Sequence, residues 1–477
     1  MPHSTTPSPF DETTYAALPD VLFERCLPVP VSRPECLVWN QALGQELGLE
    51  PWAGDAGIWS GNCLPEGAKS LAQAYAGHQF GHFTMLGDGR AHLLGEQVRA
   101  DGTRVDLQLK GSGRTVFSRG GDGRAALEPM LREYLISEAM HALGIPTTRS
   151  LAVVRTGETV RREGPLPGAV LTRVAASHLR VGTFQYAAGC GEPGVLPALV
   201  QFAIARHCPH VAQFDCPALG LLRWVVEAQA ELLAKWMLAG FVHGVMNTDN
   251  MAISGETIDY GPCAFLDAYD PATVFSSIDR QGRYAYGNQP SMALWNLSRF
   301  AETLLPELNP VDEKAVGIAE DALNLFEGHF RRTWMQGMRA KLGLFTEEEE
   351  DEGLIADLLA AMQQHHADYT LSFLSLDPDA PERCLDPAWH AAWVLRLRRE
   401  SRDPEAVRRR MREATPQVIP RNHAVEEALN AAGAGDMKPF EVLLAVLRDP
   451  FRLDEFPEKF RKGPPAGHPP YITFCGT

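Results

Sequence analysis

The spacing of hydrophobic and polar residues predicts a β-rich part early in the chain. Residues 91–98 (AHLLGEQV) and 104–109 (RVDLQL) have the composition and alternation of strands, and the Asp-Gly turn within 99–103 joins them as a hairpin. Two further strand candidates, 149–157 and 169–177, lie on either side of a segment rich in turn-forming residues.

Helical periodicity marks two longer segments. Residues 126–145 form a predicted helix, with Gly144 and Pro146 as its stop signal. Residues 220–239 form a long amphipathic helix that Gly240 ends.

The rest of the chain is predicted in less detail. Residues 251–261 predict a tight hairpin that turns at Gly255, and the pattern beyond about residue 290 is mostly helical. The acidic run 346–353 (TEEEEDEG) predicts a helix start with Thr346 as its N-cap, because carboxylates are stabilised near the positive end of a helix dipole.

Composition indicates a packed globular protein. The chain has 477 residues, 45% of them hydrophobic and 22% charged, enough for two or three ordinary domains or one large elaborated domain. Subtracting 60 acidic from 44 basic residues gives a net charge of −16. This acidic balance argues against a nucleic-acid partner, although one basic cleft for phosphates is compatible with it.

Location and redox state follow from what the sequence lacks. No stretch approaches 18 uncharged apolar residues, so no membrane partner is expected. The first ten residues contain no Lys or Arg, so they resemble neither a signal peptide nor a transit peptide. The nine cysteines form no C-x-x-C pair, which favours a reducing environment without structural zinc. We therefore expect a cytoplasmic protein. A monomer is taken as the expected state, although the sequence leaves the oligomeric state open.

Residues 243–250 (HGVMNTDN) match a kinase-type catalytic loop, H-G-D-x-x-x-x-N, at its His, Gly and Asn positions. In such loops the Asp accepts the substrate hydroxyl proton and the Asn holds a metal ion. Here the Asp position is Val245, and a carboxylate appears at Asp249, directly before Asn250. The loop by itself allows an inactive kinase, a chance match or an enzyme with rearranged chemistry.

The order of parts along the chain resembles that of a protein kinase. A hairpin ends at Lys110, a helix carrying glutamates follows, and then come the long helix, the loop and the D-x-G triplet at Asp259. The predicted fold is therefore α+β and kinase-like, with a small β-rich lobe, a larger helical lobe and helical elaborations at both ends. The sequence alone does not choose among Glu128, Glu133 and Glu138 as the partner of the lysine.

Other motifs carry less information. The chain has no G-x-G-x-x-G and no G-x-x-x-x-G-K-[ST], and the two GDGR stretches at 87–90 and 121–124 have the composition of ordinary turns. His78 and His82 have the i, i+4 spacing of a metal pair, but no third ligand is nearby. We therefore assign both to packing or loop hydrogen bonds.

Longer stretches resemble the selenoprotein O family. They are LQLKGSGRT, SRGGDGRA, LREYLISEAMHALGIPTTRSL, HGVMNTDNM, DYGPCAFLD and YGNQPSMALWNL, which together span roughly residues 70–300, and the terminal YITFCGT, with Cys third from the end. The family pattern departs at Val116, where proline is usual, and after the terminal Cys, where Ser-Ser is usual.

The resemblance implies a kinase-like fold and an activity. Family members transfer AMP from ATP to hydroxyl side chains of protein substrates, with the nucleotide flipped relative to kinases. The γ-phosphate is then buried and the α-phosphate faces the substrate. A conventional kinase that transfers the γ-phosphate and a non-catalytic ATP-binding scaffold are the alternatives. The substrate proteins and the type of residue modified are left open.

Roles around the nucleotide are implied by the same resemblance. Lys110 would contact phosphates and pair with Glu133. Gly87 and Gly89 would make backbone contacts, for which glycine-rich turns are suited, and Arg90 would reach the nucleotide.

Asp122 and Gly123 in the second GDGR would contact the sugar or base end of ATP. Arg173 and Arg180 would hold the buried phosphates, because arginine binds phosphate bidentately.

The resemblance also implies the catalytic and redox residues. Asn250 and Asp259 would hold Mg²⁺ or Mn²⁺, since both ions prefer oxygen ligands. Asp249 would accept the proton of the attacking hydroxyl. A disulfide between Cys263 and Cys475, which would lock or distort the metal-binding loop under oxidation, is a hypothesis.

The predicted organisation has four parts. They are an N-terminal wrapping segment (1–70), a small lobe with the nucleotide-binding loops (71–190), a large-lobe core with the catalytic and metal-binding loops (191–300), and a helical extension with the Cys tail (301–477).

Overall fold

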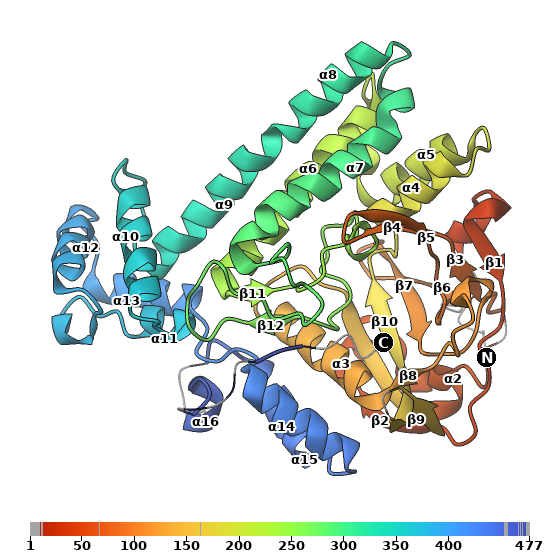
Figure 1. Cartoon of the computed structure of the whole chain (residues 1–477), viewed down its shortest axis with the longest axis horizontal. Coiled ribbons are helices and arrows are strands. Elements are labelled where there is room, and N and C mark those ends of the chain that lie inside the picture. Colours follow the sequence, from red (N-terminus) through yellow and green to blue (C-terminus); the bar gives the residue numbers. More distant parts are fainter. Residues whose placement is uncertain are drawn as a thin grey trace, which may run out of the picture.

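The computed structural model describes residues 10, 13–65, 67–162, 164–452, 457–465, 467, 469 and 471–473. Within this part the fold is α+β, as predicted: one large antiparallel sheet occupies one half of the molecule and helices make up most of the other (Figure 1).

The main sheet has eight strands in the order β1-β3-β6-β7-β10-β9-β2, with β8 paired to β10. The strands are β1 (Phe23–Arg25), β2 (Glu35–Trp39), β3 (Leu71–Gln73), β6 (Ala91–Val98), β7 (Arg104–Lys110), β8 (Ala125–Ala126), β9 (Arg149–Arg161) and β10 (Pro165–Ala175). The predicted β6–β7 hairpin is confirmed, and β9 and β10 extend farther toward each other than predicted. The register pairs Ala91 with Lys110.

Strands from the first 70 residues form both ends of this sheet. β1 pairs with β3 at one end, and β2 pairs with β9 at the other. Two short helices, α1 (Gln41–Glu46) and α2 (Ala56–Ser60), follow β2 in the chain and cover one face of the sheet. Buried side chains of β7 on this face, such as Leu107 and Leu109, pack with Trp59. The opposite face of β7 carries Asp106, Gln108 and Lys110, all buried. The alternation of β7 therefore separates an apolar face from a polar one.

Helix α3 (Leu127–Ala142) lies against the sheet beside β9 and β10 and confirms the first predicted helix. The central helix α6 (Pro217–Ala239) confirms the second, and it ends at Gly240 in the left-handed conformation. It packs along α7 and α9 (Figure 1).

The predicted helical character beyond residue 290 is also confirmed. The remaining helices are α4 (Val181–Gly189), α5 (Val195–His207), α7 (Gln289–Leu308), α8 (Asp312–Leu323), α9 (Leu325–Lys341), α10 (Asp351–Gln364), α11 (Tyr369–Leu374), α12 (Pro387–Arg399), α13 (Pro404–Ala414), α14 (Asn422–Gly433), α15 (Lys438–Leu447) and α16 (Glu458–Arg461). Within the described ranges, no helix has both the length and the apolarity needed to cross a membrane.

Two local predictions are wrong. Residues 251–261 do turn at Gly255, but its two arms bond to other segments: Ala252 bridges to Arg180, and Thr257 bridges to Thr147. Thr346 caps no helix, because its hydroxyl donates to Glu400 Oε1 (2.8 Å), and α10 begins only at Asp351. In both places tertiary partners outcompete the local pattern.

Candidate active site

The loop 243–250 is fixed at its start by buried hydrogen bonds. The His243 backbone N–H donates to Gln289 Oε1 (2.9 Å), and His243 Nε2 lies 3.0 Å from Ile258 O. Burial lowers the pKa of His243, which keeps the ring neutral. Val245, at the position of the kinase Asp, is 6% exposed and packs in the apolar core. This position therefore offers no polar group to a substrate.

Backbone pairing with residues 179–181 brings a second segment to the loop. Val181 N–H donates to Met251 O (2.9 Å) and Ile253 N–H donates to Leu179 O (3.0 Å). Arg180 lies between these two bonds and is thereby placed beside Asp249 and Asn250.

The small hairpin β4 (Ala76–Gln79) and β5 (His82–Met85) lies across the same loop. His78 N–H donates to Thr248 Oγ1 (2.7 Å), and its ring Nδ1 lies 2.8 Å from Gln185 Nε2. The assignment of His78 to packing and hydrogen bonding is confirmed. His82 is exposed, and no cluster of three or more His, Cys, Asp or Glu side chains suited to a metal ion occurs in the described ranges.

Most of the predicted site residues meet in one place. A cavity of about 80 Å³, the inner cavity, opens toward a wider outer pocket of about 560 Å³. The inner cavity is lined by Tyr75, Asp88, Gly89, Arg90, Ala91, Gln108, Lys110, Arg173, Arg180, Asp249, Asn250, Ile258 and Asp259. Five of these, Tyr75, Gly89, Arg90, Asp249 and Asp259, also line the outer pocket.

A buried charge network forms one wall of the inner cavity. Lys110 Nζ donates to Glu133 Oε2 (2.6 Å) and to Asp259 Oδ1 (2.8 Å), and Arg173 Nε donates to Glu133 Oε1 (2.9 Å). Burial alone would raise the pKa values of Glu133 and Asp259, but the adjacent Lys110 and Arg173 outweigh it and lower both. Both carboxyl groups are therefore ionised at neutral pH.

The structure places the other two candidate glutamates elsewhere. Glu138 accepts hydrogen bonds from Arg149 (2.7 Å) and Asn40 (2.7 Å), and Glu128 lies beside Gly433.

Arg180 and Asp249 each keep an unused polar atom. The Arg180 guanidinium lies over the Tyr75 ring (4.2 Å) and 3.6 Å from Asp88 Oδ1, yet its buried Nη1 donates no hydrogen bond. Asp249 Oδ1 is likewise buried without a partner, and burial raises the pKa of Asp249 to about 6. Unpaired buried polar atoms at a cavity are positions where a ligand supplies the missing partner.

Asn250 and Asp259 offer the chemistry of a metal site. Asn250 Nδ2 donates to Val245 O (3.1 Å), so Oδ1 is the side-chain atom that would face a metal ion. Asp259 contributes an ionised carboxylate. The backbone of Asp259 has a positive φ of 68°. Two oxygen ligands suit Mg²⁺ or Mn²⁺, which take further ligands from water and substrate phosphates.

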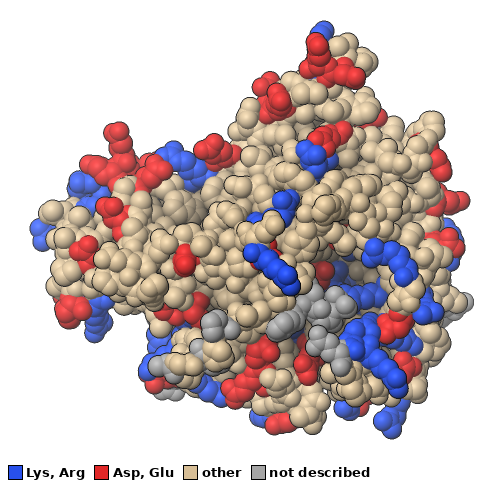
Figure 2. Space-filling view, in the orientation of Figure 1, with Lys and Arg blue, Asp and Glu red and all other residues tan. Residues whose placement is uncertain are grey.

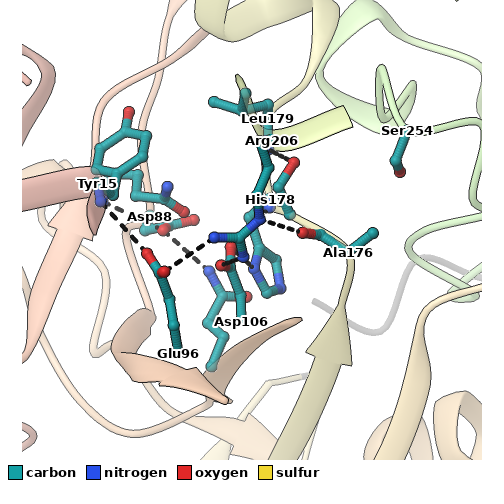
Figure 3. A network of polar contacts seen from close by, with 12 residues as sticks. Tyr15, Asp88, Glu96, Asp106, Ala176, His178, Leu179, Arg206 and Ser254 are labelled. Carbon is teal, nitrogen blue, oxygen red and sulfur yellow. Dashed lines mark hydrogen bonds and ion pairs between the residues drawn. The ribbon is translucent and has the colours of Figure 1, made fainter. Parts of the chain in front are cut away.

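The polar face of β7 supports the lining of the inner cavity through hydrogen bonds. Gln108 Nε2 donates to Asp88 (3.1 Å), and Asp106 accepts from the backbone N–H of His178 (2.9 Å), two residues before Arg180. Figure 3 shows the Asp106 carboxylate and that of Glu96 pointing toward the Arg206 guanidinium, at 2.5 and 2.9 Å.

Arg206 also donates through Nε to Ala176 O (2.9 Å). This network therefore anchors the segment that carries Arg180.

The outer pocket contains the two GDGR turns. Gly87 and Gly89 pack against Phe117, and Asp122 pairs with Arg162 (2.8 Å), which lowers the pKa of Asp122. At Gly123, with φ +68°, a side chain would collide with the backbone of Gly113. Lys and Arg side chains gather over the sheet half on the face of the molecule that Figure 2 shows.

Sequence reasoning missed Tyr75, Asp88, Gln108 and Gly77. Asp88 sits inside the first GDGR, and Gln108 has the same strand parity as Lys110, so both had a signal. Tyr75 and Gly77 had none, because their role depends on the hairpin lying across a loop about 170 residues later.

The predicted redox pair is only partly described. Cys263 is buried, its thiol donates to Tyr260 O (3.2 Å), and burial raises its pKa to about 12. Cys475 lies outside the described residues.

Comparison with known proteins shows the family of the chain. A family model described as "Protein adenylyltransferase SelO" matches residues 11–448, nearly the whole chain. The chain therefore belongs to the SelO family.

Among its relatives are three proteins named "Protein nucleotidyltransferase YdiU". The one from Brevibacillus brevis is 57% identical, covering 98% of this chain and 97% of the relative. The one from Syntrophotalea carbinolica is 57% identical with the same coverage. The one from Anoxybacillus flavithermus is 58% identical, covering 98% of each chain.

Proposed function

We propose that this protein transfers AMP from ATP to Ser, Thr or Tyr hydroxyls of other proteins. Three cationic side chains, Lys110, Arg173 and Arg180, line a cavity that has Asp249 at its junction with the wider pocket, and this arrangement supports the proposal. The family description and the names of the relatives support the same reaction.

In the proposed geometry the β- and γ-phosphates occupy the inner cavity. Lys110, Arg173 and Arg180 neutralise their charge, and Arg90, which lines both pockets, reaches the nucleotide. The backbone at Gly87 and Gly89 borders the nucleotide.

The remaining part of ATP extends into the outer pocket, toward Asp122 and Gly123. The α-phosphorus then faces Asp249.

Asp249 is proposed as the general base. Its carboxylate takes the proton of the attacking hydroxyl, whose oxygen bonds to the α-phosphorus while the bond to the β-phosphate oxygen breaks and pyrophosphate leaves. A pKa of about 6 leaves most of this group ionised at pH 7 and still close to the working pH. Asn250 and Asp259 would hold Mg²⁺ or Mn²⁺, which neutralises phosphate charge when bound.

We further propose a kinase-like fold and a cytoplasmic location for the protein. The sheet half and the helical half correspond to the two lobes of a kinase-like fold, with boundaries near residues 70, 190 and 300. This assignment is supported by four residues, Lys110, Glu133, Asn250 and Asp259. They follow the kinase order along the chain and lie together at the inner cavity. We place the protein in the cytoplasm as a monomer that acts on proteins and binds no nucleic acid, as the acidic balance favours.

We also propose that Cys263 and Cys475 form a disulfide under oxidation. Peptide maps with and without reductant, after mild oxidation, would show a linked pair of peptides containing Cys263 and Cys475. Two free thiols after oxidation would remove the idea.

Transfer of label tests the reaction. The protein is incubated with ATP labelled at the α- or the γ-phosphate, together with Mg²⁺ or Mn²⁺ and candidate protein substrates. Label from the α position alone is expected; label from the γ position alone would indicate a kinase, and no label a scaffold. Asp259→Ala should abolish transfer, and retained activity would overturn the metal assignment.

A further inference from the structure

The strand β5 of the small hairpin has one open edge. The hairpin forms a sheet of its own, so within the described ranges β4 is the only strand that pairs with β5. The N–H of Leu86 donates to Tyr75 O (2.9 Å), and in an antiparallel pair every second residue directs its N–H and C=O toward the partner strand. The N–H and C=O groups of Phe83 and Met85 therefore point away from β4. An open edge of this kind is a template for one more strand.

The side chains on this strand are also uncovered. Phe83 is 50% exposed and Met85 is 45% exposed, although both are apolar. They lie two residues apart and so project from the same face of the hairpin. The His78 ring, across from Phe83, lies 5.2 Å from the Phe83 ring and 5.3 Å from the Trp295 ring of α7. An apolar strip therefore runs from β5 to α7; it consists of Met85, Phe83, His78 and Trp295.

A cation without a carboxylate partner lies at the α7 end of this strip. The Arg283 guanidinium lies over the Trp295 ring (4.8 Å) and near the Tyr284 ring (5.7 Å). Among the described residues it forms no ion pair, and its buried Nε has no hydrogen-bond partner. The neighbouring Asp279 accepts hydrogen bonds from the backbone N–H groups of Arg283 (2.9 Å) and Tyr284 (2.7 Å). The surface around β5 is therefore complementary to a segment that carries apolar side chains and a carboxylate.

The hairpin also borders the place where the acceptor hydroxyl must enter. Gln79 of β4 and Gly87, two residues beyond the end of β5, both line the outer pocket. Gly77 of β4 lies against Asp249, the proposed general base. Because a strand advances about 3.3 Å per residue, a chain that pairs with β5 reaches the outer pocket within a few residues.

We propose that β5 binds the protein substrate as an added strand. The substrate segment is extended and pairs through its backbone with Phe83 and Met85. Its alternate side chains are apolar and pack on the strip, a carboxylate pairs with Arg283, and the chain continues into the outer pocket with the acceptor hydroxyl. The substrate class is thus a flexible acidic segment of a protein, not the surface of a folded helix. This inference rests on the proposed AMP transfer, because it concerns how the acceptor of that reaction is held.

Hydrogen exchange of the full chain tests the binding without the chemistry. The probe is a synthetic peptide in which Val alternates with Glu and which ends in a Ser-Thr-Tyr stretch; the control peptide has Lys in place of every Glu. The Glu peptide should slow exchange of the Phe83 and Met85 amides at least about tenfold, because each N–H gains an acceptor, and the Lys peptide should slow it less. Mass spectrometry of overlapping fragments across residues 80–87 measures the effect. Unchanged exchange at millimolar Glu peptide would overturn the proposal.

A proline in β5 tests strand addition in the reaction itself. Met85→Pro removes an N–H that the hairpin does not use and places a ring at the open edge. Met85→Thr is the matched control, since it removes the same side chain and keeps the N–H. With α-labelled ATP, Met85→Pro should lower kcat/KM for the Glu peptide at least about tenfold relative to Met85→Thr, while both keep the Kd for ATP within about twofold of wild type. Equal kcat/KM values for the two variants would overturn strand addition.

Arg283→Gln tests the carboxylate contact. It should reduce the preference for the Glu peptide over the Lys peptide several-fold, because the glutamine carries no charge. An unchanged preference would overturn this contact.

The docking site and the proposed reaction fail in different ways. If wild-type protein labels neither peptide but the Glu peptide protects the β5 amides, AMP transfer is wrong and the strand site stands. If both peptides and both Met85 variants give equal labelling, AMP transfer stands and strand addition is wrong.

Discussion

Gly77 is the residue whose substitution tests the placement of Asp249 most selectively. A Cβ at position 77 would lie 2.8 Å from Asp249 Cγ and 2.9 Å from Leu86 Cδ1, and closer still to Asp249 Oδ1. Carbon atoms in contact prefer about 3.5–4.0 Å, so Gly77→Ala must push the carboxylate away by roughly 1 Å. The three atoms nearest to the added Cβ belong to Asp249 and Leu86, and none belongs to an arginine or lysine of the inner cavity.

The expected result is a loss in the chemical step. A displacement of roughly 1 Å in a catalytic group costs about 10²-fold, within the 10²–10⁴-fold that a general base contributes. We therefore predict that Gly77→Ala lowers kcat for AMP transfer by about 100-fold and leaves the Kd for ATP within about twofold. Initial rates with α-labelled ATP give kcat, and calorimetric titration gives Kd.

Gly81→Asn is the matched control. Gly81 lies in the same hairpin, no atom is within 4 Å of its Cβ position, and asparagine tolerates its positive φ. This variant should keep kcat. An unchanged kcat in Gly77→Ala, or an equal loss of ATP affinity and rate, would refute the assignment of Asp249.

Three other substitutions test the buried charges. Glu133→Gln leaves two buried cations without their shared carboxylate, so the free energy of unfolding in urea should fall by about 3–5 kcal/mol and recover partly with ATP and Mg²⁺; no loss would contradict the network. Val245→Asp should destabilise the fold by about 3 kcal/mol or more without producing transfer from γ-labelled ATP, since the position faces the core; gain of kinase activity would contradict this. Burial raises the pKa of Glu256 from 4.5 to about 7. The folded state therefore keeps a proton that the unfolded state releases, and stability falls by about 3 kcal/mol between pH 4.5 and 7. Glu256→Gln should remove that slope in urea unfolding at pH 5 and 7.5, and parallel curves for the two proteins would contradict it.

Local patterns predicted the parts of the site that secondary structure alone positions. Strand alternation placed Lys110 at the end of β7, and the glycine at 240 correctly ended α6. The helix period did not choose among three glutamates, because that choice depends on which one faces Lys110 and Arg173 across the sheet.

The remaining features depend on contacts between distant segments. The arms at 251–261 bond to segments more than 70 residues away, and Tyr75 stacks on Arg180 beside the cavity. Periodicity carries no information about such partners, so hairpin pairing was predicted where only the turn exists. The carboxylate at Asp249 was visible in the sequence, but its burial against Gly77 was not.

The central claim concerns which phosphate faces Asp249. A crystal structure with a non-hydrolysable ATP analogue and Mg²⁺ tests it directly. We predict that the γ-phosphate contacts Arg173 and Arg180 in the inner cavity and that the α-phosphorus is the phosphorus atom nearest to Asp249. A γ-phosphorus nearest to Asp249, with the α-phosphate in the inner cavity, would contradict the account.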